Sequence, residues 1–445
     1  MTASTALLEF PVAAPDRRAA KDSRYWKFLS GLWAFYFLLV FSVGRYPQLT
    51  QPLTWGGALI VGTLTAFAFL KRLQAPPREA WLLWAFAAWC LTGVPFVIDW
   101  PAFTRALQMA IELAIITSLV GVIIRNSGSF KWFYLAFIGS VFFNVLVGLD
   151  SLSLDNLAAD SAVAQHRSGG MTGNPNGLGF YCFIGLLSVM GLFAEIRSLP
   201  GRVALLATTI PGLYGLVVSA SRGAFTIFLI TLLLWPLMCL RDLLRYRLLV
   251  LLAAILLAGL AVGFGQRVLN DTYLGKRMTD AIRMEDNSSQ TRFDLFSAAI
   301  KAFAGHPIAG VGVGQFRFVN GFDLVSHDEW GDLLSGTGLV GFSLYMSVYV
   351  SLWLRLRRAG RRATDVLTRY RVSFAKLILV VLVISGMLFR SHYICIDSMF
   401  LIALVVGTAE WAVGQSKVSQ ELLEAPLTGA ITVAQSANQI ACNYT

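Results

Sequence analysis

Charged side chains are scarce in this sequence, and their scarcity argues against a soluble fold. Asp, Glu, Lys and Arg make up 14% of the 445 residues and 56% are hydrophobic, whereas a soluble globular protein carries roughly 25% charged residues. The excess apolar surface must face lipid. Several stretches with few charges are long enough to cross a hydrocarbon core about 30 Å thick. The sequence therefore predicts an all-α membrane protein that crosses the bilayer many times.

Cysteine and metal-binding patterns are also sparse. Of the five cysteines, four lie inside apolar segments and one lies near the end of the chain: Cys90, Cys182, Cys239, Cys395 and Cys442. This placement indicates no disulfide framework. The sequence has no HExxH motif and no Cys/His cluster, so we expect no metal and no other cofactor. No cleavable signal peptide is indicated, because the polar segment 1–25 leads directly into an apolar run of spanning length.

The net charge of +11 would suggest nucleic acid in a soluble protein. Here the basic residues form short clusters between apolar runs, as topology determinants do, so we expect no nucleic-acid partner. Within 26–412 we predict about twelve spans, each about 20 residues long. They lie at 26–43, 52–70, 79–97, 104–124, 131–150, 177–195, 203–220, 223–240, 248–265, 336–354, 373–390 and 393–412.

The positive-inside rule orients these spans. One set of connections carries clusters such as the arginine-rich stretch 355–371, whereas the short connections on the other side carry single arginines. This bias predicts that both termini are cytoplasmic. It also predicts two longer outer loops, 151–176 and 266–335. The last segment, 413–445, is rich in small polar residues and is expected to be a disordered inner tail.

Two outer arginines stand beside small residues. Arg167 precedes a Gly- and Asn-Pro-Asn-Gly-rich stretch, 169–177, which is either a substrate-facing irregular segment or an ordinary turn before the next span. Arg222 lies in the tight hairpin 219–224. Such a hairpin needs Gly and Ser but not Arg, so Arg222 either reaches lipid headgroups or binds an anion through its planar guanidinium.

The long outer loop contains a predicted amphipathic helix at 289–304, which begins beside Arg292 and lies on the membrane or on the bundle. Its apolar positions recur at helical spacing: Phe293, Phe296, Ile300 and Phe303. The glycine-rich stretch 306–316 follows. Without a strand before it and a helix after it, this pattern is weak evidence for a phosphate-binding loop, and backbone packing is the favoured interpretation.

A histidine lies just before the tenth predicted span, in the run His327-Asp328-Glu329. Near neutral pH a histidine can act as a general base. The alternative is a structural histidine held by hydrogen bonds. All four histidines of the chain fall on the predicted outer side.

These outer elements together resemble the O-antigen ligase and polymerase family. The match covers about 165–345 and rests on four features. They are Arg167 with the Asn-Pro-Asn loop, the S-x-S-R-G-A hairpin at 219–224, the stretch from Arg292 to Phe316, and His327 followed by Gly338 and Gly341. The residue after the histidine departs from the family, which usually has Asn, Ser or Gln where this chain has Asp328.

The resemblance implies a GT-C-like bundle with a large, partly helical periplasmic loop, in a bacterial inner membrane. The implied activity is metal-independent transfer of glycan from undecaprenyl diphosphate to lipid A core or to a growing polysaccharide. It also implies roles for the matching residues: His327 as catalytic residue, Arg222, Arg167 and Arg292 on the diphosphate, and Asp328, Gly338 and Gly341 in support.

The residue inventory suits this chemistry by itself. Arginines can stabilise a diphosphate leaving group without a metal, a neutral histidine can take a proton from a sugar hydroxyl, and the membrane lipids would hold the donor. Two alternatives remain. A polymerase would share every motif. A transporter or flippase of lipid-linked sugars would fit twelve spans, but the sequence has no clear internal repeat of the kind common in transporters.

Overall fold

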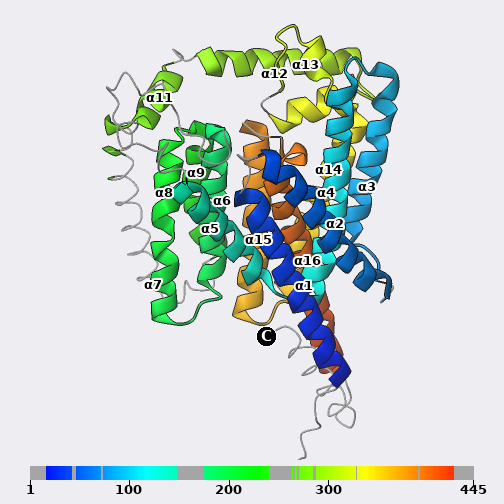
Figure 1. Cartoon of the computed structure of the whole chain (residues 1–445), viewed down its shortest axis with the longest axis vertical. Helices are drawn as coiled ribbons and strands as arrows, with labels where there is room; N and C mark the ends of the chain where they lie inside the picture. Colours follow the sequence, from blue (N-terminus) through cyan, green and yellow to red (C-terminus); the bar gives the residue numbers. More distant parts are fainter. Residues whose placement is uncertain are drawn as a thin grey trace, which may run out of the picture.

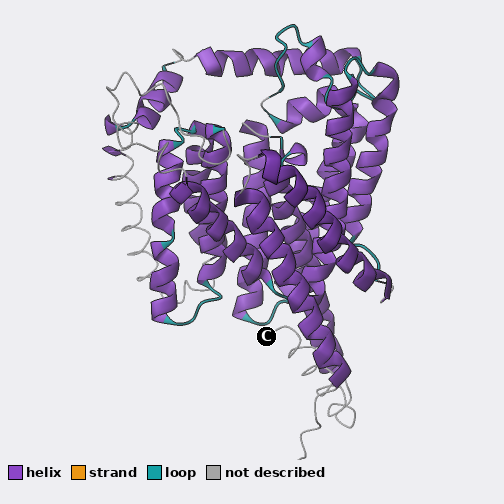
Figure 2. Ribbon diagram, in the orientation of Figure 1, coloured by secondary structure: helices purple, strands orange, loops and turns teal. Residues whose placement is uncertain are grey.

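The computed structural model describes residues 17–42, 47–71, 74–147, 174–239, 263, 266–267, 270–283, 287–326, 328–388 and 391–424. Every element in this part of the chain is a helix (Figure 2). The first half contains α1 (Arg17–Ser42), α2 (Pro47–Lys71), α3 (Arg78–Cys90), η1 (Leu91–Phe96), α4 (Trp100–Ser127), α5 (Phe130–Val147), α6 (Pro175–Phe193), α7 (Leu199–Ala207), α8 (Thr209–Val218) and α9 (Arg222–Cys239). The second half contains α11 (Tyr273–Ile282), α12 (Asn287–Gly305), α13 (Phe316–Val319), α14 (Glu329–Arg362), α15 (Val366–Leu388), η7 (His392–Ile394) and α16 (Ile396–Glu424).

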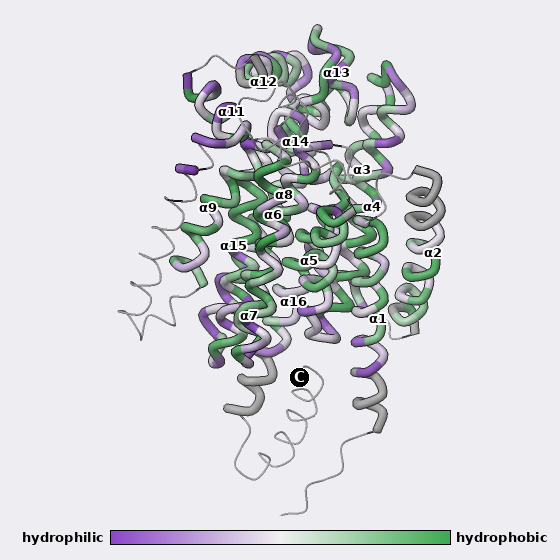
Figure 3. The backbone as a smooth tube through the Cα atoms, turned by 60° about the vertical axis from the view of Figure 1, so that its left-hand side comes forward, coloured by the Kyte–Doolittle hydropathy of each residue, from purple (hydrophilic) through white to green (hydrophobic). Residues whose placement is uncertain are grey.

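Nine helices within the described residues are long and apolar enough to cross a membrane. They are Arg24–Ser42, Arg78–Phe96, Trp100–Ser127, Pro175–Phe193, Leu199–Val218, Arg222–Cys239, Glu329–Arg362, Val366–Leu388 and Ile396–Gln415. Figure 3 shows their hydrophobic middles aligned in one band, with the hydrophilic segments above and below it. The prediction of an all-α polytopic membrane protein is confirmed in this part of the chain.

The exact number of twelve spans is not reached among the described residues. Two predicted spans, 52–70 and 131–150, fall on shorter apolar helices, Gly56–Ala68 and Phe130–Leu146. Apart from one residue, the predicted span 248–265 lies outside the described part of the chain.

The two ends of the bundle differ (Figure 1). Helices α11, α12 and α13 lie across one end, which we name the loop end, and α1 begins and α16 ends at the opposite end, which we name the terminal end. The start and the finish of the described helices are thus on the same side, as the charge bias predicts. Between the ends, α4 packs along α16, where Gly407 lets the helices approach so closely that a Cβ there would lie 2.6 Å from Ile124 Cβ.

Two helices extend beyond their predicted limits. Helix α14 begins at Glu329, seven residues before the predicted start of that span. Asp328 caps its first turn and so stabilises helix in this segment. The segment was not predicted to be part of the span because it is too polar. Helix α16 continues to Glu424 through part of the segment predicted to be disordered. That extension is rich in Gln, Lys, Leu and Glu, all strong helix formers.

The predicted helix at 289–304 exists as α12, but its packing face differs from the expected one. Leu295 and Ala299 are buried together with Phe316, whereas Phe293 is 67% exposed and Ile300 is 41% exposed. The expectation was based on large apolar residues at helical spacing. The close approach of α14, where a Cβ on Gly331 would lie 3.2 Å from Ala299 Cβ, favours the smaller side chains on the other face.

Candidate active site

The start of α14 is fixed by Asp328. This residue has extended backbone angles, and its carboxylate accepts a hydrogen bond from Gly331 N, as an N-cap does. Ser326 Oγ donates to Asp328 Oδ2 at 2.8 Å, and the side chain is buried. His327, the predicted catalytic residue, lies outside the described residues, but it directly precedes this fixed cap.

The capping role favours a short polar residue at this position. Asn, Asp and Ser are equally good N-caps, because each presents a side-chain oxygen to the free N–H groups of the first turn. Asp328 therefore caps the helix as Asn or Ser would, and it places a carboxylate beside position 327.

Gly338 interrupts α14 with a left-handed backbone, φ 66°, a conformation that glycine adopts at low cost. The glycine-rich segment before α13 lies against this break. Gly312 N donates to Gly336 O at 3.0 Å, and Leu339 N donates to Pro307 O at 2.8 Å. A Cβ on Gly338 would overlap the Ile308 carbonyl. These contacts favour backbone packing over phosphate binding for the glycine-rich stretch.

Gly341 serves a similar purpose one turn later. Helix α3 packs against α14 here, and the indole Nε1 of Trp89 on α3 donates a hydrogen bond to Thr337 O at 2.9 Å. A Cβ on Gly341 would lie 2.9 Å from Trp89 Cδ1. Both supporting glycines of the motif thus act by allowing other parts of the chain to approach α14 closely.

Gln315 ties the same segment to α4. Its side chain is fully buried; Oε1 accepts from Ile98 N and from Asp99 N, both at 2.8 Å. Nε2 donates to Asp99 O at 2.9 Å. Asp99 in turn caps α4 by accepting from Ala102 N at 2.7 Å. One glutamine therefore positions the segment next to the start of α4, and a cavity lies between them.

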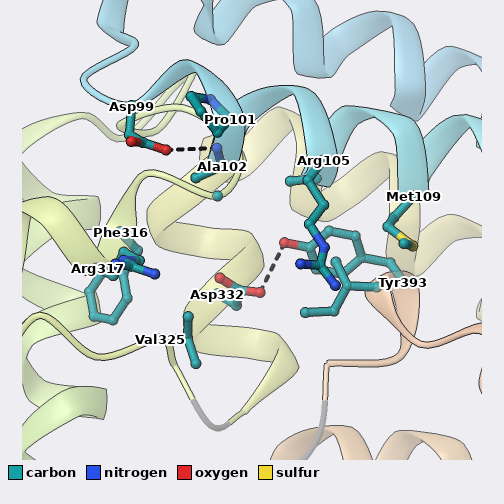
Figure 4. Close-up of a pocket in the computed structure, with 13 residues that line it drawn as sticks. Asp99, Pro101, Ala102, Arg105, Met109, Phe316, Arg317, Val325, Asp332 and Tyr393 are labelled. Carbon is teal, nitrogen blue, oxygen red and sulfur yellow. Dashed lines mark hydrogen bonds between the residues drawn. The ribbon is translucent and has the colours of Figure 1, made fainter. Parts of the chain in front are cut away.

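This cavity has a volume of about 470 Å³ and lies at the loop end. Figure 4 shows the residues that line it. It is lined by Asp99, Pro101, Ala102, Arg105, Ala106, Met109, Gly314, Phe316, Arg317, Val325, Asp332, Tyr393 and Ile394. Figure 4 shows the Arg105 side chain extending over Asp332 and Tyr393. The lining combines two guanidinium groups with carboxylates and a phenol, which suits a polar ligand that carries hydroxyls and negative charge.

Tyr393 and Asp332 form the floor of the cavity. Tyr393 Oη donates to Asp332 Oδ2 at 2.9 Å, and Ser391 Oγ donates to the same oxygen at 3.1 Å. Burial, with the negative charge of Asp332, holds the pKa of Tyr393 well above its usual value. The phenol therefore stays protonated near neutral pH and remains a hydrogen-bond donor to the carboxylate.

Beneath the cavity, Glu329 anchors η7 to α14. This carboxylate is 1% exposed, and it accepts from Tyr345 Oη at 2.9 Å and from His392 N at 2.8 Å. The His392 ring shares hydrogen bonds with Ser398 Oγ at 2.8 Å and Ser385 Oγ at 2.9 Å. Hydrogen bonds therefore hold the His392 ring in place, as in a structural histidine.

Arg222 occupies a different part of the loop end. It begins α9, and its Nη1 donates to Arg277 O at 3.2 Å, while Arg277 Nη1 donates to Ala220 O at 2.8 Å. The small residues of the hairpin allow α6 to pack closely against it. A Cβ on Gly179 of α6 would lie only 2.6 Å from Ser221 Cβ. Arg222 is half-buried against α11, which argues against a side chain extended toward lipid headgroups.

The predicted site residues are thus brought together only in part. Asp328, Gly338 and Gly341 share the first turns of α14 with Asp332. Arg292 lies half-buried on α12, one turn before Leu295 on the face that packs toward α14, and neither it nor Arg222 lines the cavity. Arg167 lies outside the described residues.

Four side chains of the cavity were missed as site candidates: Arg105, Arg317, Asp332 and Tyr393. Two of them carried a signal. Arg105 is one of the few arginines in short outer connections, and Asp332 lies one helical turn after Asp328, on the same side of α14. The sequence contains no local feature that associates Tyr393 with this helix.

Comparison with known families identifies residues 204–346 as matching the O-antigen ligase family. The matched segment contains Arg222, Arg292, Asp328, Gly338 and Gly341, and it confirms the resemblance to this family. No curated protein matches the chain. Within the described residues, no group of three or more His, Cys, Asp or Glu side chains is placed to hold a metal ion, and metal independence remains a prediction.

Proposed function

We propose that this protein is a membrane glycosyltransferase of the O-antigen ligase type. It transfers a glycan from undecaprenyl diphosphate to an acceptor hydroxyl on lipid A core or on a growing polysaccharide. The match of residues 204–346 to the O-antigen ligase family supports this activity class.

The observation that carries the proposal is the cavity beside the first turn of α14. A 470 Å³ space is large enough for a few sugar rings, and its wall includes Asp332, one turn after the Asp328 cap that follows His327. We assign the cavity to the saccharide portion of a substrate, because carboxylates and a phenol bind hydroxyl groups and Arg105 with Arg317 suits an anionic sugar or a phosphate.

In the proposed reaction the acceptor oxygen attacks the anomeric carbon of the donor glycan. A new glycosidic bond forms, and the bond from the anomeric carbon to the diphosphate oxygen breaks. His327 takes the acceptor proton as general base, and undecaprenyl diphosphate leaves. Arg222, Arg167 and Arg292 stabilise the charge that develops on the diphosphate. The half-buried environments of Arg222 and Arg292 reduce screening by water and strengthen such contacts.

The loop end is proposed to face the periplasm of a bacterial inner membrane, with the terminal end in the cytoplasm. The basic clusters between spans support this orientation. The test is a His327→Cys substitution in a cysteine-free variant. An impermeant maleimide should label it in intact spheroplasts. Labelling only after lysis would reverse the orientation and remove the mechanism with it.

Activity is tested with purified protein in nanodiscs, a labelled undecaprenyl-diphosphate glycan and either lipid A core or a second lipid-linked glycan as acceptor. Label on lipid A core identifies a ligase. Label on a longer lipid-linked glycan identifies a polymerase. In liposomes, movement of the labelled donor across the bilayer without a new glycosidic bond would identify a transporter and contradict the proposal.

A further inference from the structure

A second cavity, of about 260 Å³, lies at the terminal end. Its walls come from four separate parts of the bundle. Lys27 lies in the first half of α1, and Lys131 lies in the first turn of α5. Glu195 follows the end of α6, and Arg371 lies near the start of α15. The cavity is therefore a built junction between helices, distant from the cavity at the loop end.

One cation of this cavity is already neutralised. Arg371 forms a bidentate pair with Glu195, with Nε and Nη2 at 2.6 and 2.8 Å from the two carboxylate oxygens. Its guanidinium also lies 4.8 Å from the ring centroids of both Phe130 and Trp411. This arrangement fixes the back wall of the cavity and uses the charge of Arg371 internally.

The two lysines differ from Arg371 because no described carboxylate balances them. Among the residues that the structure describes, neither Lys27 nor Lys131 pairs with a carboxylate. The Lys131 ammonium lies 5.6 Å from the centroid of the Trp132 ring, and no hydrogen bond joins it to another residue in the described part of the chain. The cavity also includes the first residues of α5, where the partial positive charge of the helix start favours an anion. Two ammonium groups around one cavity therefore call for an anionic ligand.

The position of the cavity relative to the bilayer and the apolar surface beside it indicate that the anionic group belongs to a lipid. Lys27 lies at the beginning of the candidate span Arg24–Ser42, the level at which lipid headgroups lie. Toward the bilayer centre the adjoining surface is apolar and open, with Phe28 59% exposed, Trp132 42% exposed and Leu135 45% exposed. Aromatic residues such as Trp132 concentrate at this interface. A soluble anion would use none of this apolar surface.

We propose that this cavity binds the phosphate of an anionic phospholipid, with Lys27 and Lys131 as its ligands and with the acyl chains along the exposed surface of α1 and α5. Basic pockets between spanning helices are known to bind acidic headgroups. The proposal is independent of the glycosyltransferase activity, because it concerns the opposite end of the bundle.

The test measures lipid binding to purified full-length protein in detergent by native mass spectrometry. Phosphatidylglycerol and phosphatidylcholine with identical acyl chains are compared on the wild type, on Lys27→Gln/Lys131→Gln, and on Lys27→Arg/Lys131→Arg. The matched control is Lys276→Gln/Lys301→Gln, which removes two exposed lysines at the loop end. Thermal unfolding with inorganic phosphate tests the soluble anion as an alternative ligand.

The wild type, the arginine variant and the control should prefer phosphatidylglycerol, and the glutamine variant should lose about 30-fold in affinity for it, from the typical effect of two basic residues at a membrane surface. Equal binding of the two lipids by the wild type would overturn the proposal, and so would an equal loss in the control. Lysine-dependent stabilisation by inorganic phosphate that matches the stabilisation by phosphatidylglycerol would assign the cavity to a soluble anion instead.

Discussion

Charges are handled differently at the two ends of the bundle. At the terminal end, cations and carboxylates pair directly: Arg355 lies 2.6 Å from Glu79 and 2.8 Å from Glu410, and Arg371 holds Glu195. At the loop end the carboxylates of Glu329 and Asp332 accept instead from hydroxyl and backbone N–H groups. The one ion pair found there among the described residues, Arg317 with Asp323, spans 3.5 Å between exposed side chains.

The paired charges of the terminal end and the cavity of the loop end serve different purposes. A charge that is already paired inside the protein has little left for a ligand, whereas Arg105 borders an open cavity and belongs to none of the ion pairs found among the described residues. Ion pairs within a membrane protein lower the cost of placing charge near lipid, so the pairs of Arg355 and Arg371 contribute to stability. Substitutions in these ion pairs and substitutions in the cavity at the loop end should therefore be separable by measuring transfer and unfolding together.

The largest effect is expected for Arg222→Ala, which should abolish transfer while the protein still inserts and folds. Arg222→Lys should restore little activity, because an ammonium lacks the planar fork that binds two phosphate oxygens. The Arg283→Ala variant, which removes an exposed arginine after α11, is the control and should stay active. Full transfer by Arg222→Ala, measured with the labelled donor, would dismiss the diphosphate role and weaken the proposed difference between the two ends.

His327→Ala should reduce transfer about 10²–10⁴-fold, the usual contribution of a general base, with an unchanged melting temperature. Because the neutral imidazole is the active form, wild-type transfer should rise with pH through the histidine titration. The exposed His306 provides the control, His306→Ala. A flat wild-type profile from about pH 5 to 8.5, together with an active His327→Gln variant, would show that the side chain only donates a hydrogen bond.

Arg355→Met tests the terminal end. Glu79 is fully buried, and Ser351 Oγ would remain as its partner. Loss of one partner of a buried ion pair typically costs about 3–5 kcal/mol, so the unfolding temperature should fall while transfer per folded molecule stays constant. Arg358→Met, an exposed position on the same helix, should unfold like the wild type. A selective loss of transfer in Arg355→Met at unchanged stability would break the comparison.

The smallest effect is expected for Asp328→Asn. Asn caps a helix as well as Asp does, so stability should change by less than about 1 kcal/mol, and transfer should persist. The loss of one negative neighbour should move the pH profile of His327 toward lower pH, because a nearby carboxylate favours the charged imidazole. Asp328→Ala, which removes the cap, should destabilise the protein by about 1 kcal/mol or more. Equal stability of the two variants would refute the capping role.

Helices and the region of the site could be predicted from the sequence because both depend on local patterns. An apolar run of about 20 residues defines a span wherever it packs, and the spacing from Asp328 to Gly338 and Gly341 is visible as text. The reasons for that spacing were not visible. Gly338 is required by the backbone of residues 307–312, which a sequence pattern does not place against α14.

The partners of buried polar groups were also beyond prediction. Glu329 meets the backbone of His392, 63 residues later, and Gln315 meets Asp99, 216 residues earlier. These pairs depend on how α3, α4, α14 and η7 pack, and no periodicity encodes that arrangement. Arg222 could be singled out from the sequence because an arginine is unusual in a tight hairpin. Arg277, which packs beside it, could not, because its sequence context is that of an ordinary loop residue.

The break at Gly338 has a consequence for the order in which the protein assembles. Carbonyl groups of Ser335 and Gly336 accept bonds from Val311 and Gly312, so they are satisfied only after that segment has docked. The part of α14 beyond the break bonds within itself and can enter the bilayer as soon as it is synthesised, as a spanning helix does. We therefore expect maturation in two stages, with insertion first and the cavity completed last.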